Sequence, residues 1–89
     1  MQISDDNKEK IEQAFLQVQT DCLPTLNKLR NINNIAQLQE KVYLKVKKYE
    51  DSFNNCMAKA RTPIDGDYCA NELVNNLTVD FKPKLKKIL

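Results

Sequence analysis

The chain of 89 residues contains no histidine and no tryptophan, and it has one glycine and three prolines. Without histidine, a nucleophilic cysteine lacks its usual basic partner. The scarcity of glycine also makes a phosphate site of the glycine-rich-loop type hard to build. Three cysteines without histidine, at spacings of 34 and 13 positions, do not match zinc-site spacing. The sequence therefore predicts no enzyme, no metal site and no cofactor.

Long apolar runs are missing as well. No stretch approaches the roughly 20 apolar residues that span a bilayer. The first ten residues, MQISDDNKEK, lack the apolar segment of a signal peptide and carry early acids that transit peptides avoid. We therefore expect neither a transmembrane segment nor either kind of targeting peptide.

The residues that are present favour helices. Asp5-Asp6-Asn7 precedes a periodic run, and Asp6 with Glu9 forms a capping-box-like start. The apolar positions of this run recur every three or four residues, as in an amphipathic helix. They are Ile11, Phe15, Val18, Cys22, Leu26 and Leu29. Because proline costs about 3 kcal/mol inside a helix, we expect a kink or a break near Pro24.

A second apolar stripe is longer and predicts a helix over residues 34–60. Its positions are Ile35, Leu38, Val42, Val46, Tyr49, Phe53 and Cys56. The helix should end before Thr62, because the residue preceding Pro63 is biased toward extended backbone. A turn over residues 62–67 follows, with Asp67 as the expected N-cap of a helix over 67–79. We expect this last helix to fade near Thr78 or Asp80.

These elements predict an all-α fold of three to four helices, ending in an antiparallel hairpin of residues 34–60 and 67–79. Residues 1–81 form one small domain, and residues 82–89 form a basic tail. The tail's four lysines are Lys82, Lys84, Lys86 and Lys87. Such a tail is usually a solvated end, and the alternative is peripheral contact with an acidic protein or membrane surface.

The hairpin places Cys56 and Cys69 side by side across its turn. Antiparallel helices joined by a short loop bring such positions together, so a disulfide is one candidate state. The alternative is a pair of reduced thiols on the apolar faces, where cysteine serves as a small hydrophobe. Cys22 also lies on an apolar face, and we expect it to be a buried free thiol.

Two further motifs have simpler explanations. With Gly66 at position six, residues 61–72 match part of an EF-hand loop. Arg61 and Pro63 would then occupy positions one and three, where calcium needs oxygen ligands, so a capped turn is favoured. The aromatic residues Tyr43, Tyr49 and Phe53 lie near lysines, but two of them share the core stripe. The balanced charge also argues against nucleic-acid binding.

Residues 35–82 resemble the small translocase chaperones of the mitochondrial intermembrane space. That family carries two Cys-x3-Cys motifs around a loop, and the twelve residues between Cys56 and Cys69 fall in the range of its inner pair. The outer pair would lie at Ser52 and Leu73, so half of the motif is absent. Twin Cys-x9-Cys subunits of respiratory complexes look similar at this level. The resemblance implies a helical hairpin, oxidative folding and the intermembrane space.

The function we expect is that of a non-catalytic accessory or scaffold subunit in a larger assembly of the mitochondrial respiratory chain or inner membrane. A short chain with a small core gains stability from partners, and its amphipathic faces offer them a surface. The candidate interaction residues are Ile35, Leu38, Val42, Val46, Tyr49 and Phe53. The alternative is an independent binding module, either chaperone-like for apolar segments or a degenerate EF-hand. The alternative location is the cytoplasm.

Overall fold

The computed structural model describes residues 3–28 and 31–88, apart from the side chains of residues 32 and 86–88. Helix α1 spans Asp5–Lys28, α2 spans Ile32–Lys59 and α3 spans Pro63–Asn75. α3 continues into a π-helical turn, η1 (Asn76–Asp80), and then into α4 (Phe81–Ile88). We call these last three elements the third rod. The described residues form helices and no strand, which confirms the all-α class.

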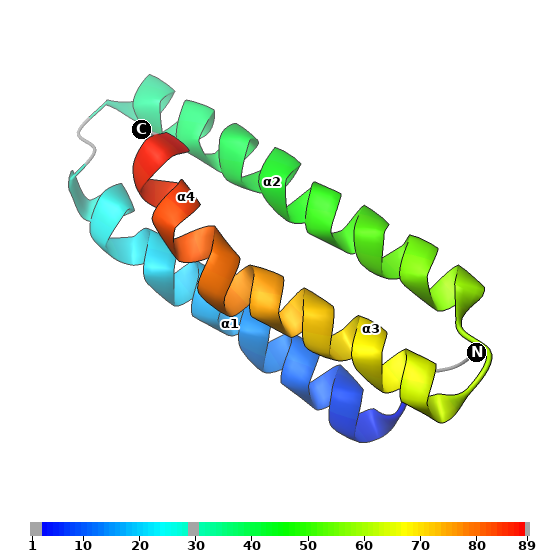
Figure 1. The fold of residues 1–89 in the computed structure, drawn as a ribbon. Helices are drawn as coiled ribbons and strands as arrows, with labels where there is room; N and C mark the ends of the chain where they lie inside the picture. The colour runs from blue at the N-terminus through cyan, green and yellow to red at the C-terminus, as the bar shows by residue number, and fades with distance from the viewer. Residues whose placement is uncertain (1–2, 29–30, 89) are drawn as a thin grey trace.

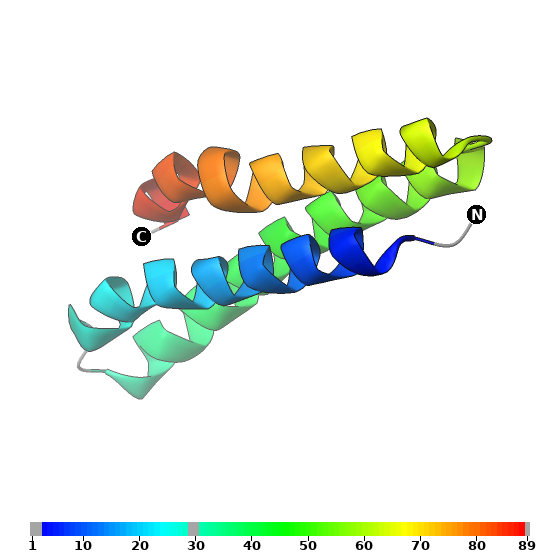
Figure 2. The same ribbon diagram turned by 90° about the horizontal axis from the view of Figure 1, so that it is seen from below.

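The third rod packs against both α1 and α2. It lies between α1 and α2 in the view of Figure 1, and Figure 2 shows it on one side of both. It is antiparallel to α2, which confirms the hairpin, and parallel to α1 (Figure 1). Among the described residues, the backbones of α1 and α2 hardly approach each other, because each packs along the third rod instead. The molecule is elongated, with extents of 48 × 20 × 18 Å.

Apolar side chains from all three rods meet in one core. The third rod supplies the most deeply buried of them, since Leu77 and Phe81 are 0% exposed. The buried members of the cluster are Ala14, Val18, Cys22, Leu38, Tyr49, Leu73, Leu77, Phe81 and Leu85. Burying a large apolar side chain contributes about 1.5–3 kcal/mol. The third rod therefore holds α1 and α2 together.

The start of α1 differs from the prediction by two residues. The Ser4 hydroxyl accepts the backbone N–H of Asn7 at 3.3 Å, so Ser4 caps the helix rather than Asp6. Asp5 and Asp6 lie in the first turn, where their charges favour the positive end of the helix dipole. The Asn7 side chain is buried and donates to the Asp67 carboxylate at 2.6 Å, which ties α1 to α3.

Two prolines lie inside helices without breaking them. α1 runs through Pro24 as one helix, so the break, which is one of the two predicted alternatives, is wrong. The third rod runs through Pro83, so the helix predicted to fade near Thr78 or Asp80 continues to Ile88. Phe81 and Leu85 flank Pro83 and are both buried. Their burial exceeds the cost of about 3 kcal/mol for the proline.

This continuation changes the expected basic tail. Residues 82–88 are helical rather than a separate segment, and Leu85 packs in the core. Lys82 and Lys84 are therefore held in place on α4. The side chains of Lys86 and Lys87 lie outside the described part of the chain.

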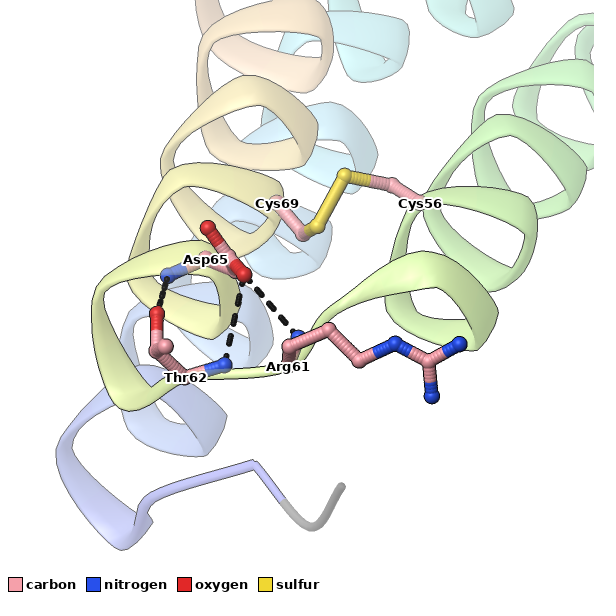
Figure 3. Close-up of a disulfide and its surroundings, with 5 residues drawn as sticks. All are labelled: Cys56, Arg61, Thr62, Asp65 and Cys69. Atoms are coloured by element: carbon pink, nitrogen blue, oxygen red, sulfur yellow. Dashed lines mark hydrogen bonds between the residues drawn. A yellow bond between two sulfur atoms is a disulfide. The ribbon is translucent and has the colours of Figure 1, made fainter.

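The turn between α2 and α3 is shorter than predicted. Thr62, and not Asp67, is the N-cap of α3, and Pro63 occupies the first helical turn. The Thr62 hydroxyl accepts the Asp65 backbone N–H at 3.2 Å, and the Asp65 carboxylate accepts the Thr62 N–H at 3.2 Å (Figure 3). This is a reciprocal capping box. Because the chain is helical from Pro63 onward, residues 61–72 form no twelve-residue calcium loop.

Candidate functional site

A disulfide joins the two helices of the hairpin. Cys56 on α2 and Cys69 on α3 are bonded with their Cα atoms 5.7 Å apart, which confirms the disulfide candidate. Figure 3 shows the bond lying beside the capped turn, with the Arg61 side chain directed away from it. Cys69 is buried, whereas Cys56 is half-buried. The staple therefore fixes α2 against α3 next to the turn that already reverses the chain.

The Asp65 carboxylate strengthens this turn. It accepts the backbone N–H of Arg61 at 2.9 Å as well as that of Thr62. The hydrogen bond from Arg61, followed by those involving Thr62, lowers the pKa of Asp65. An ionised Asp65 at the start of α3 also interacts favourably with the helix dipole. The disulfide and the capping box thus close the same end of the bundle.

The third cysteine behaves differently. Cys22 is a free, buried thiol on α1, as expected. Burial raises its pKa, and the neighbouring Asp21 carboxylate raises it further. Both effects disfavour the thiolate, which is the nucleophilic form. Among the described residues, no group of three histidine, cysteine or acidic side chains is arranged to hold a metal ion.

The six predicted interaction residues all face the inside of the bundle to some degree. Leu38 and Tyr49 are buried in the core, with 2% and 8% of their surfaces exposed. The other four are half-buried, and they are Ile35, Val42, Val46 and Phe53. Contact of any of the six with a partner stays a prediction.

The two flanks of the α2 core stripe face different neighbours. On one flank, Ser52 and Cys56 line a groove of about 290 Å³ together with Cys69 of α3. Phe53 lines the same groove. Val42 and Val46, which are four residues apart and so share a side of the helix, do not line it and lie on the other flank. This second flank therefore faces α1.

The same division holds for α1. Lys10 and Gln17 line a groove of about 680 Å³ together with Val74 and Lys82 of the third rod. Ile11, Phe15 and Leu26 lie on the other flank and pack against the core while half-buried. We call the apolar surface between the two helices the α1–α2 seam. Its residues are Ile11, Phe15, Leu26, Val42 and Val46.

An exposed aromatic residue borders the seam. Tyr43 is 63% exposed and lies one turn before Val46 on the same flank of α2. Its neighbour Leu44 is 53% exposed but points about 100° away around the helix, because an α-helix turns once every 3.6 residues. The two residues therefore present large apolar groups on different faces of α2.

A polar cluster connects α2 to the third rod. The Tyr49 hydroxyl donates to Asp80 Oδ2 at 2.6 Å, and Lys84 Nζ reaches the same oxygen at 2.6 Å. Lys45 Nζ and Lys84 Nζ lie 5.7 and 5.9 Å from the centroid of the Tyr49 ring. We call these four residues the Tyr49 cluster. Sequence reasoning missed it, since Tyr49 and Asp80 are 31 positions apart.

The pKa values within the cluster follow from these contacts. Burial, followed by the hydrogen bond to Asp80, raises the pKa of Tyr49 to about 12. The hydrogen bonds from Lys84 and Tyr49 lower the pKa of Asp80. The contact with Lys84 lowers the pKa of Lys45, and burial and the positive charges of Lys84 and Lys48 act in the same direction. Tyr49 therefore stays protonated and Asp80 stays charged near neutral pH.

Comparison with protein families and with curated proteins found no relative. No protein-family model matches the chain, and no curated protein matches it. Within the described residues, no helix has both the length and the apolar character needed to cross a membrane.

Proposed function

We propose that the protein is a non-catalytic accessory or scaffold subunit that binds another protein through the α1–α2 seam. The observation that carries the proposal is the open arrangement of these two helices. Their backbones approach the third rod and hardly each other, although side chains of both helices share the core. Five apolar side chains lie on the flanks by which the two helices face each other. These side chains are half-buried, so each still exposes apolar surface. A partner that covered them would gain the free energy of removing that surface from water.

Tyr43 supports the same surface. Aromatic residues are enriched at protein interfaces, because they bury a large area and lose little conformational entropy. A tyrosine that is 63% exposed at the rim of an apolar seam makes few contacts with its own bundle. In the proposed complex, its ring packs on the partner beside Val46.

The disulfide supports an oxidising location for this subunit. A bond between Cys56 and Cys69 persists where thiols are not continuously reduced. The proposed compartment is the mitochondrial intermembrane space, which is the one implied by the resemblance to its stapled hairpins. Thiol labelling of native material after acid trapping and denaturation tests it: one labelled thiol, from Cys22, is the expected count, and three would contradict the location.

The matched pair Tyr43→Ala and Leu44→Ala tests the binding surface. Both substitutions remove an exposed side chain from adjacent positions of α2, so both variants should fold. Each tagged variant is expressed in the native source, and the size of its assembly is measured by gel filtration and native mass spectrometry. We expect Tyr43→Ala to weaken the assembly about tenfold or more, as for an interface hot spot, and Leu44→Ala to retain it.

Two results would contradict the proposal. The first is a wild-type protein that is recovered as a monomer under all conditions. The second is an assembly that responds equally to both substitutions, because the α1–α2 seam would then have no special role. Circular dichroism of both variants excludes a folding defect as the cause.

A further inference from the structure

The Tyr49 cluster carries more positive charge than its own acid can neutralise. Lys45 and Lys84 both lie against the Tyr49 ring, and Lys48 is close enough to Lys45 to act on its charge. Asp80 is the acid of this cluster, and its Oδ2 atom already receives Lys84 and the Tyr49 hydroxyl. Two ammonium groups of the cluster thus share one carboxylate, which leaves an excess of one positive charge, and Lys48 adds to the positive charge around Lys45.

Among the charged groups of the Tyr49 cluster, the ammonium of Lys45 is the one without an ion pair among the described residues. Within the described chain, its ammonium lies near the face of Tyr49 and the neighbouring Lys84, and the charge of Asp80 acts on it from beyond ion-pair distance. Two ammonium groups in contact repel each other unless an anion lies between them. The stem of Lys45 is half-buried, which limits how far the two groups can separate. The arrangement is therefore favourable when an anion joins Lys45 to Lys84.

The backbone holds this arrangement in place. Asp80 is the last residue of the π turn η1, and Lys84 follows four residues later on α4. A π turn widens the helix locally and changes the direction of the residues that follow, and such turns are frequent at functional sites. Here the turn directs Asp80 toward Tyr49 of α2. Asp80 in turn positions Lys84 beside Lys45, with 41% of the Lys84 side chain open to solvent.

We propose that Lys45 and Lys84, with Lys48 beside them, bind a phosphate group at the junction of α2 with η1 and α4. A phosphate monoester carries about −1.5 to −2 charges at neutral pH and three acceptor oxygens, so different oxygens can accept from Lys45 and Lys84 while its charge also attracts Lys48. The phosphate group can belong to a lipid headgroup or to a free phosphate ester, because the recognised chemistry is the same.

The site is separate from the α1–α2 seam. Lys45 lies on the flank of α2 that faces the third rod, whereas Val42 and Val46 lie on the flank that faces α1. Loss of phosphate binding therefore leaves the proposed protein interface intact, and the two proposals can fail independently.

The test is a titration of the full chain with inorganic phosphate that is monitored by two-dimensional NMR. The titration starts from phosphate-free buffer and is carried out at constant ionic strength. We expect saturable shifts at the amides of Tyr49, Asp80 and Lys84. Lys45→Gln removes the charge and should weaken the apparent affinity about tenfold, the usual cost of one charge-assisted hydrogen bond. Lys45→Arg should restore most of it. Lys47→Gln is the matched control, because Lys47 pairs with Asp51 at 3.7 Å elsewhere on the same helix.

Vesicle binding distinguishes the two sources of phosphate. We expect a lipid-headgroup site to make the protein sediment with phosphatidic acid vesicles but not with phosphatidylcholine vesicles. This sedimentation should require Lys45 and should be abolished by glycerol phosphate. Saturable phosphate binding without sedimentation would assign the site to a free phosphate ester. Absence of saturable binding in the wild-type protein, or equal affinities for wild type, Lys45→Gln and Lys47→Gln, would overturn the proposal.

Discussion

Removal of the disulfide should cost this protein a large part of its stability. Cys56 and Cys69 are 13 positions apart, and a loop of this size loses about 3 kcal/mol of stabilisation when its cross-link is broken, on the chain-entropy model. Small domains have about 5–15 kcal/mol of total stability. For a chain of this length, each kcal/mol corresponds to about 4–8 °C in Tm. Reduction should therefore lower Tm by about 12–24 °C.

The stabilisation by the cross-link can be measured apart from the packing of the two sulfur atoms. Reduction leaves both sulfur atoms in place, with Cys69 2% exposed, so it chiefly removes the cross-link. The double substitution Cys56→Ala and Cys69→Ala also removes the sulfur atoms and adds a cavity cost of about 1 kcal/mol. The double variant should therefore be slightly less stable than the reduced wild-type protein. Its stability should not respond to a reducing agent.

Thermal and urea unfolding followed by circular dichroism provide the measurement, with and without a phosphine reductant. The control is Cys22→Ala, which removes a buried free thiol but keeps the staple. That variant should lose a similar amount of Tm to the wild type on reduction. A loss below the ~4 °C that corresponds to 1 kcal/mol would refute the reasoning, because the capped turn alone would then hold the hairpin.

Two further predictions concern single side chains. Thr62→Ala removes the acceptor of the Asp65 N–H and should cost about 1 kcal/mol in urea unfolding, whereas Thr62→Ser, which keeps the hydroxyl, should cost much less. The pKa of Tyr49 is raised to about 12, so the folded state holds this proton more tightly than the unfolded chain. Its contribution is fully present below pH ~10 and should be lost between pH ~10 and ~12, on the order of 2 kcal/mol. Tyr49→Phe should remove this alkaline loss, and an unchanged pH profile of unfolding would contradict the assignment.

Local signals in the sequence predicted several elements because the interactions involved are close in the chain. The apolar stripe from Ile35 to Cys56 predicted α2 to within a few residues at each end. The Thr-Pro-x-Asp order at residues 62–65 is itself a capping-box signal, and placing the cap at Asp67 overlooked it. The start of α1 shows the same pattern, since Ser4 lies three residues before Asn7. In both places the N-cap is a hydroxyl residue that precedes the predicted aspartate: Ser4 instead of Asp6, and Thr62 instead of Asp67.

The proline positions were misjudged for a different reason. Helix propensity assigns a cost to Pro24 and Pro83 from their neighbours in the chain alone. The outcome depends on what the flanking residues bury, and Phe81 and Leu85 bury their side chains against α1 and α2. Tertiary contacts of this kind override a local cost of about 3 kcal/mol.

The sequence by itself determined that the chain is all-α, that a turn near Pro63 reverses it, and that Cys56 and Cys69 come close across that turn. Those features depend on periodicity and on contacts within some 13 positions. The tertiary structure decided which side of each helix is covered. Tyr49 packs in the core and bonds to Asp80, whereas the α1–α2 seam and Lys45 remain partly open. An apolar stripe predicts that a helix face is buried. Which helix covers that face depends on how the third rod packs against α1 and α2.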